Sequence, residues 1–137
     1  MKVLLDTNVV LDVLLMRQPW VAHSQLVWAA CDEGRIQGHI AAITPPNIFY
    51  IVRKLVDAGR ARECVKICLE AFGVLNLDQA SLRDALNRNG ADFEDDIHVA
   101  CASACGIDAI ITRDPRGFAG APMPIFDPAT FLARLPQ

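Results

Sequence analysis

The chain has 137 residues, of which 53% are hydrophobic and 21% are charged, a composition typical of one compact domain with a sizeable core. Thirteen Lys and Arg against sixteen Asp and Glu give a net charge of -3, which excludes a uniformly basic nucleic-acid-binding surface. No run approaches the roughly 18 unbroken apolar residues of a membrane span, so we expect no association with a membrane.

The cysteine count favours a reducing compartment. Five cysteines are an odd number, and the N-terminal run lacks the cleavage site of an export signal, so we expect reduced thiols and a cytoplasmic protein. Cys64 and Cys68, like Cys101 and Cys105, are one helical turn apart, a spacing compatible with a thiolate metal site. Small buried side chains on helix faces are the more common use of this spacing.

Short apolar runs alternate with amphipathic segments along the chain. Residues 2–6 predict a buried first strand, and Thr7 and Asn8 are suited to cap the helix that follows. A second helix is expected at 23–33 and a second strand at 39–43. Beyond them, helices are predicted at 44–57, 62–72, 78–86, 92–105 and 127–135, with strands at 73–77, 109–112 and 124–126.

Continuous apolar strands separated by helices are typical of parallel sheets that are covered on both faces. The sequence therefore predicts an α/β fold, a three-layer sandwich with a mostly parallel central sheet of about five short strands and helices on both faces. We expect residues 1–137 to form it as a single domain.

Asp6 directly follows the first predicted strand. Ligands of open α/β sheets bind beyond the carboxyl ends of the strands, where a carboxylate suits a hard cation such as Mg²⁺. Asp is also a favoured helix cap, but Thr7 or Asn8 would more naturally fill that position. We therefore expect the Asp6 carboxylate to be free at the strand tip and to be functional.

Four acids fall within residues 92–96, where a helix is predicted to begin. Asp92 as the cap with an acid at the third helical position has the form of a capping box, and acids in a first turn complement the helix dipole. Four acids exceed what capping requires, so a capping and a functional role for Asp95 both stay open. We expect Asp92 and Asp95 to share a face, with Glu94 and Asp96 pointing elsewhere.

Asp114 follows the fourth predicted strand and precedes a proline. An Asp-Pro turn would explain it, but its place at the end of a core strand favours function. Asp108, at the other end of this strand, is expected to be an ordinary loop residue. His98 lies one turn after Asp95 and could face the same cavity, although a partly exposed helix residue is the more common case.

Three segments together resemble the PIN domain, the nuclease fold of the VapC-type toxin ribonucleases in type II toxin–antitoxin pairs. They read Leu4-Leu5-Asp6-Thr7-Asn8, Asp92-Phe93-Glu94-Asp95 and Ile111-Thr112-Arg113-Asp114. Such proteins hold Mg²⁺ or Mn²⁺ with about four acids and cleave RNA. By this resemblance Asp6, Asp95 and Asp114 are metal ligands and catalytic residues. The residues expected to support them are Asn8, Thr112 and Asp92.

The chain departs from the family pattern at the second acidic position. PIN nucleases usually place a Glu in the first turns of the helix after the second strand, and here Asn47 stands in its place. A subgroup of PIN-like proteins shares this Asn. An amide oxygen can ligate a cation but brings no charge, and we count Asn47 among the expected catalytic residues.

Other side chains near the three segments are open to two interpretations. Arg113 and Arg116 flank Asp114 and could hold phosphates, or they could be solvated turn residues. Trp20 and Trp28 could serve an interface, although core packing is the more common use of such residues.

The resemblance implies a metal-dependent endoribonuclease, the toxin of a pair, with an RNA substrate, a small antitoxin as partner and a homodimer as the assembly. The alternative is a weak or inactive PIN-like module that binds RNA or a protein, which Asn47 favours and the three retained acids oppose. An α/β phosphatase with an Asp nucleophile is disfavoured, because such enzymes commonly place a second Asp where this chain has Asn8.

Overall fold

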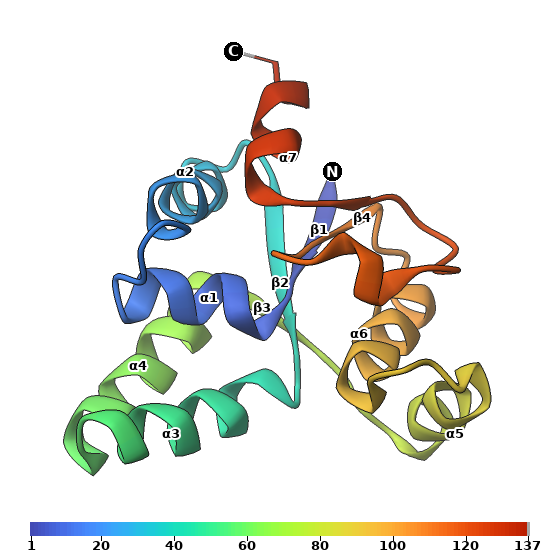
Figure 1. Ribbon diagram of the computed structural model, residues 1–137, viewed down its shortest axis with the longest axis horizontal. Helices are drawn as coiled ribbons and strands as arrows, with labels where there is room; N and C mark the ends of the chain where they lie inside the picture. The colour runs from blue at the N-terminus through green and yellow to red at the C-terminus, as the bar shows by residue number, and fades with distance from the viewer. Residues whose placement is uncertain (137) are drawn as a thin grey trace.

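The computed structural model describes residues 1–136 and contains a five-stranded, entirely parallel sheet in the order β3-β2-β1-β4-β5 (Figure 1). The central strand is β1, paired with β2 on one side and β4 on the other. The strands are β1 (Lys2–Leu5), β2 (Gln37–Ala41), β3 (Gly73–Leu75), β4 (Ala109–Ile111) and β5 (Ile125–Phe126).

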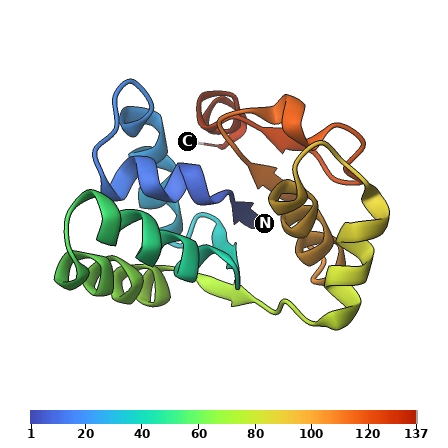
Figure 2. The same ribbon diagram turned by 60° about the horizontal axis from the view of Figure 1, so that its bottom comes forward.

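Helices connect the strands and cover both faces of the sheet (Figures 1 and 2). They are α1 (Thr7–Leu14), α2 (Val21–Asp32), α3 (Thr44–Leu55), α4 (Ala58–Ala71), α5 (Gln79–Arg88), α6 (Phe93–Ala104) and α7 (Pro128–Arg134), with a short 3-10 helix, η1 (Pro115–Phe118). No helix in this part of the chain is long and apolar enough to cross a membrane.

Alternate residues of β1 explain why the sheet is buried on both sides. Val3 and Leu5 pack into one core with α1, α2, α3, α4 and α7, while Leu4 packs into a second core with α5, α6 and η1. All three side chains are fully buried. A parallel strand covered on both faces needs apolar residues at every position, and the predicted α/β sandwich is confirmed.

The boundary between α3 and α4 corrects one prediction. We expected the helix from Thr44 to run to about Asp57 and the next helix to begin at Arg62. Instead α3 ends at Leu55, and the Asp57 side chain accepts a hydrogen bond from the Arg60 backbone N–H at 2.7 Å, which makes it the N-cap of α4. Asp at this position satisfies a backbone donor that would otherwise lack a partner.

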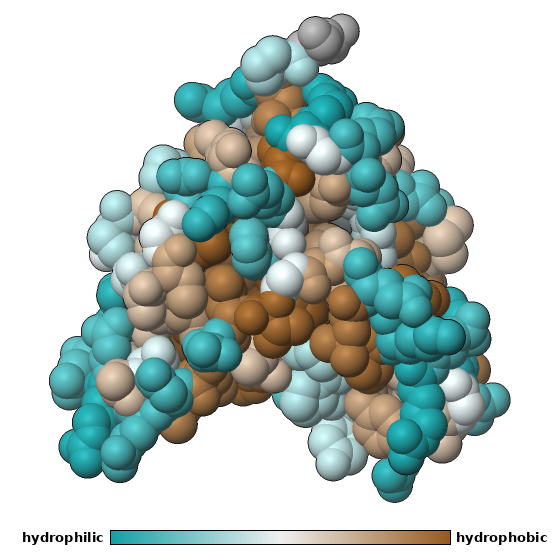
Figure 3. Space-filling model, turned by 180° about the vertical axis from the view of Figure 1, so that it is seen from behind, coloured by the Kyte–Doolittle hydropathy of each residue, from teal (hydrophilic) through white to brown (hydrophobic). Residues whose placement is uncertain are grey.

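Two helix pairs, α3 with α4 and α5 with α6, form arms on either side of the sheet (Figure 2). Seen from behind, hydrophobic residues gather between these arms (Figure 3). The first turns of α1, α3 and α6 all follow or face the carboxyl ends of the strands, so their side chains converge at one edge of the sheet.

Candidate functional site

A polar cavity of about 540 Å³ lies beyond the carboxyl ends of β1 and β4. The predicted acids Asp6, Asp95 and Asp114 all line it, together with their predicted supporting residues and four further side chains. The complete lining is Asp6, Asn8, Trp20, Asp92, Asp95, Thr112, Arg113, Asp114, Arg116 and Phe118. The structure thus brings three segments that are far apart in the sequence to one place.

Asp6 connects β1 to α1 and is almost fully buried. Contrary to the expectation that Thr7 or Asn8 would cap the helix, Asp6 itself holds the N-cap position, because Thr7 already has helical geometry. Its side chain nevertheless makes no capping hydrogen bond. Its Oδ2 instead accepts a hydrogen bond from Thr112 Oγ1 at 2.8 Å, which fixes the carboxylate at the tip of the strand.

Asp92 and Asp95 share the cavity but have different surroundings. Asp92 is the N-cap of α6, since its Oδ1 accepts hydrogen bonds from the backbone N–H groups of Glu94 and Asp95 at 2.8 and 3.2 Å. Asp95 is half-buried, and burial together with the carboxylates of Asp6 and Asp92 raises its pKa to about 7. A bound cation reduces the repulsion between carboxylates that are crowded in this way.

Glu94 was expected to point away from this site, and that expectation is wrong. Its Oε1 lies 3.7 Å from Nε2 of His98, one helical turn further along α6. The same Nε2 lies 3.4 Å from Asp6 Oδ1, and His98 is fully buried rather than partly exposed. The four-residue spacing between Glu94 and His98, which places both on one helix face, was the signal in the sequence.

Asn47, in the first turn of α3, touches the same carboxylate. Its Nδ2 donates a hydrogen bond to Glu94 Oε1 at 3.2 Å. His98 and, more weakly, Asn47 lower the pKa of the Glu94 carboxyl group, which favours its ionised form. Glu94 therefore brings a negative charge to the place where Asn47 has none.

The group formed by Asp6, Glu94 and His98 fits a divalent cation. One ligand atom from each lies within 4.8 Å of the other two. Both ring nitrogens of His98 are buried and have no hydrogen-bond partner among residues 1–136, so a ligand would satisfy a group that is otherwise costly to bury. Two carboxylates and an imidazole are ligands for Mn²⁺ and other divalent ions, and the carboxylates also suit Mg²⁺.

The third predicted acid, Asp114, lies at the exposed rim of the cavity. Its Oδ1 is 3.3 Å from Nε of Arg116, which is itself largely exposed. Its backbone N–H donates to Thr112 Oγ1 at 3.3 Å, so Thr112 links Asp114 to Asp6.

Arg113 pairs with a buried acid, whereas its position beside Asp114 suggested a phosphate or solvent as its partner. Its Nε lies 3.1 Å from Oδ2 of Asp12, a carboxylate on α1 that is fully buried. Burial raises the pKa of Asp12, and the charges of Arg113 and Arg17 oppose that rise. The Arg113 charge therefore balances a buried acid, while its side chain also lines the cavity.

The cysteines lie away from this cavity and are all free thiols. Cys64, Cys68 and Cys101 are buried, and burial raises the pKa of Cys68 to about 12 and that of Cys101 to about 11. Buried thiols with such pKa values are poor nucleophiles at neutral pH.

Comparison with known proteins identifies relatives of this fold. A family model described as PIN domain matches residues 2–116. No curated protein sequence matches the chain. Among solved structures, DNA-bound VapBC from Salmonella typhimurium is similar with a TM-score of 0.72 and 21% identity, covering 93% of this chain and 98% of that one.

Two further structures show the same likeness. A toxin–antitoxin complex from Klebsiella pneumoniae has a TM-score of 0.67 and 23% identity over 92% of this chain and 97% of that one. The sarcin–ricin-loop-cleaving toxin VapC20 of Mycobacterium tuberculosis has a TM-score of 0.70 and 13% identity, covering 85% and 93%. At these identities the likeness shows the fold alone.

Proposed function

This chain belongs to the PIN domain family, and on that premise we propose that it is a metal-dependent endoribonuclease and the toxin of a toxin–antitoxin pair. The observation that carries the proposal is the group of Asp6, Glu94 and His98, with Asp6 and His98 buried and Glu94 partly exposed, whose ligand atoms lie within 4.8 Å of one another at the carboxyl end of the sheet. Asp95 and Asp114 extend it into a cavity with room for a phosphate.

The proposed cofactor is Mg²⁺ or Mn²⁺, held by Asp6 and Glu94 with His98 beside them. Such an ion polarises a phosphate oxygen and lowers the pKa of a bound water. Thr112 orients the Asp6 carboxylate through the 2.8 Å hydrogen bond, and Asn47 orients Glu94. These hydrogen bonds hold the ligands in place before substrate arrives.

Asp95 is suited to proton transfer. In the metal-free protein its pKa is raised to about 7, and a bound cation would favour the ionised carboxylate, which could accept a proton from an attacking water. Asp114 and Arg116 form an exposed pair at the rim, where they would contact a bound RNA strand.

Cleavage of a mixed pool of structured and single-stranded RNA tests the proposal. We expect cleavage with Mg²⁺ or Mn²⁺ and none with EDTA. Cleavage that persists undiminished in EDTA would contradict a metal-dependent mechanism. Absence of cleavage under all metal conditions would contradict the nuclease itself.

The second candidate is a PIN-like module that binds RNA or a protein without cutting. Asn47, which brings no charge to the second acidic position, favours it, and the Glu94 carboxylate at 3.2 Å opposes it. Calorimetric titration with Mn²⁺ separates the two, because a binding-only module has no need for a divalent site. Saturable binding that is lost on chelation supports the nuclease.

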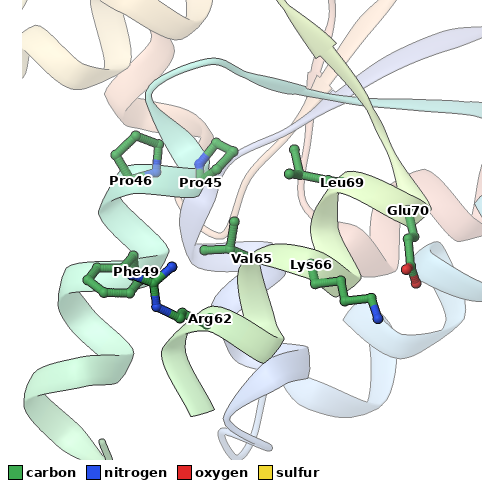
Figure 4. A pocket seen from close by; sticks show the side chains of 8 residues that line it. All are labelled: Pro45, Pro46, Phe49, Arg62, Val65, Lys66, Leu69 and Glu70. Carbon is green, nitrogen blue, oxygen red and sulfur yellow. The ribbon is translucent and has the colours of Figure 1, made fainter. Parts of the chain in front are cut away.

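We also propose a surface for the antitoxin. A groove of about 520 Å³ runs between α3 and α4, where Pro45, Pro46 and Phe49 face Val65 and Leu69 (Figure 4). Leu69 is 54% exposed. Pro45 and Pro46 belong to the first turn of α3, so a partner helix seated in the groove would lie beside that turn. Leu69→Asp should weaken association with a co-expressed antitoxin without changing metal affinity.

The same arm favours self-association. Tyr50 on α3 is 64% exposed and Leu55 is 61% exposed, a concentration of apolar surface typical of interfaces. We propose that the chain forms a homodimer in the cytoplasm, the compartment in which it would meet an RNA target. Light scattering after gel filtration measures the mass, and a monomer at all concentrations would contradict the dimer.

A further inference from the structure

Trp20 stands at the acidic cavity in an unusual setting for a large aromatic side chain. It lies immediately before α2, is 42% exposed, and lines the cavity together with Asp6 and Asp95. The only other tryptophan, Trp28, packs edge-on against Phe72 with 4.7 Å between ring centroids and belongs to the core. Core packing therefore accounts for Trp28 and leaves Trp20 unexplained.

The indole ring of Trp20 packs against the guanidinium group of Arg113. The guanidinium carbon of Arg113 lies 4.0 Å from the ring centroid, within the range of a cation–π interaction. Arg113 is in turn anchored by the buried carboxylate of Asp12 at 3.1 Å. The stack of Asp12, Arg113 and Trp20 presents an aromatic surface in a defined orientation at the edge of the cavity.

A second cavity continues from this surface. It measures about 350 Å³ and shares Trp20 and Arg113 with the acidic cavity, so these two residues form the wall between them. The rest of its lining is mainly apolar or aromatic and comprises Pro19, His23, Asp127, Pro128 and Ala129.

The charges of the acidic cavity favour an uncharged contact with RNA in addition to the contacts with its phosphates. Its lining contains four carboxylates and two arginines, and one of these arginines, Arg113, neutralises Asp12. Phosphates therefore find little cationic surface there. Stacking on an aromatic ring needs no charge and accepts any base, because every base has a π-face.

We propose that Trp20 is a substrate-binding residue that stacks an unpaired nucleobase next to the cleaved phosphate, with the base seated in the 350 Å³ cavity. This rests on the proposed function, since it assumes that the acidic cavity receives RNA. It favours a substrate that is single-stranded at that nucleotide, because extruding a base from a duplex costs unstacking and unpairing energy.

Tryptophan fluorescence gives a direct test. In a Trp28→Phe variant, Trp20 is the sole tryptophan, and stopped-flow mixing in Mg²⁺ reads binding before cleavage. We expect short single-stranded RNA to quench the fluorescence. An abasic ribose-phosphate oligomer of equal length should bind without quenching. Binding of RNA without any quenching would overturn the proposal.

Substitution of the ring supplies the second readout. Trp20→Leu keeps an apolar cover over Arg113 but removes the stacking face, and we expect about 5-fold to 150-fold weaker binding of labelled RNA by anisotropy. Its affinity for the abasic oligomer should match that of the wild type, and circular dichroism should show the same fold. Equal RNA affinity in Trp20→Leu and wild type would overturn the proposal.

The failure of the stacking proposal is distinguishable from the failure of the proposed function. If the wild type binds RNA and quenches but never cleaves it, the nuclease fails and the stacking role stands. If the wild type cleaves RNA and Trp20→Leu binds and cleaves equally well, the nuclease stands and the stacking role fails. If the wild type binds neither oligomer, both fail.

Discussion

The side-chain amide of Asn47 donates a hydrogen bond to the Glu94 carboxylate at 3.2 Å, which joins the first turns of α3 and α6 although these residues are 47 positions apart. A carboxylate from another helix thus lies beside the position where the family pattern has a Glu. Because Glu94 also lies 3.7 Å from His98, it belongs to the same group as Asp6.

Replacing Glu94 should therefore cost metal affinity. We expect Glu94→Gln to weaken Mn²⁺ binding at least about 10-fold, because it removes one of the two carboxylate ligands of this group. Asp96→Asn is the matched control, since Asp96 is two residues away on α6 and accepts a hydrogen bond from the Gly90 backbone N–H instead. Equal Mn²⁺ affinities in the two variants, measured by calorimetry, would show that Glu94 is not a ligand.

The pKa of Asp95 makes metal binding depend on pH. Below its value of about 7 the carboxyl group holds a proton that disfavours a cation, so metal affinity should rise as pH rises from 6 to about 8. Calorimetry in buffers of different ionisation enthalpy measures the proton released on binding. The Asp95→Asn variant should release fewer protons when it binds metal. An unchanged proton release would contradict the assignment of this proton to Asp95.

The same pKa predicts how the metal-free protein responds to pH. Because the folded pKa lies above the ordinary value of 3.8, the native state holds a proton that the unfolded state loses first. The contribution of Asp95 to stability therefore declines as pH rises from about 4 to 7. In EDTA, the urea midpoint of Asp95→Asn minus that of the wild type should increase as pH rises from 5 to 8. A constant difference would contradict the raised pKa.

The buried ion pair of Asp12 and Arg113 predicts a large stability effect. Arg113→Ala leaves the fully buried Asp12 carboxylate without its nearest partner, which should cost about 3–5 kcal/mol in the free energy of unfolding. Arg116→Ala is the control, because its pair with Asp114 is exposed and worth at most about 1 kcal/mol. Urea denaturation measures both, and similar losses would mean that Arg113 is not anchored by Asp12.

Much of this arrangement follows from local sequence signals. An acid directly after an apolar run placed Asp6 at a strand tip, and the Asp92 cap was visible from the acids that follow it. Asp108 lies at the opposite end of the sheet, as its place before the fourth strand predicted. Its carboxylate accepts a hydrogen bond from the backbone N–H of Lys2 at 2.8 Å.

The remaining contacts depend on how distant helices pack. Nothing local to Asn47 indicates that the first turn of α3 faces α6, so Glu94 could not be assigned to the site by counting from Asp95 alone. The pairing of Arg113 with Asp12 likewise depends on α1 turning a charged residue inward, where amphipathic spacing predicts a polar residue facing solvent.

The most direct test of a metal-dependent nuclease centred on Asp6 compares two single substitutions of the same kind. Asp6→Asn and Asp108→Asn are purified identically and assayed for RNA cleavage with Mg²⁺ or Mn²⁺, and circular dichroism and urea denaturation check that both fold. We expect Asp6→Asn to abolish cleavage and Asp108→Asn to retain the wild-type rate. Cleavage by folded Asp6→Asn at the wild-type rate would contradict the assignment of this site.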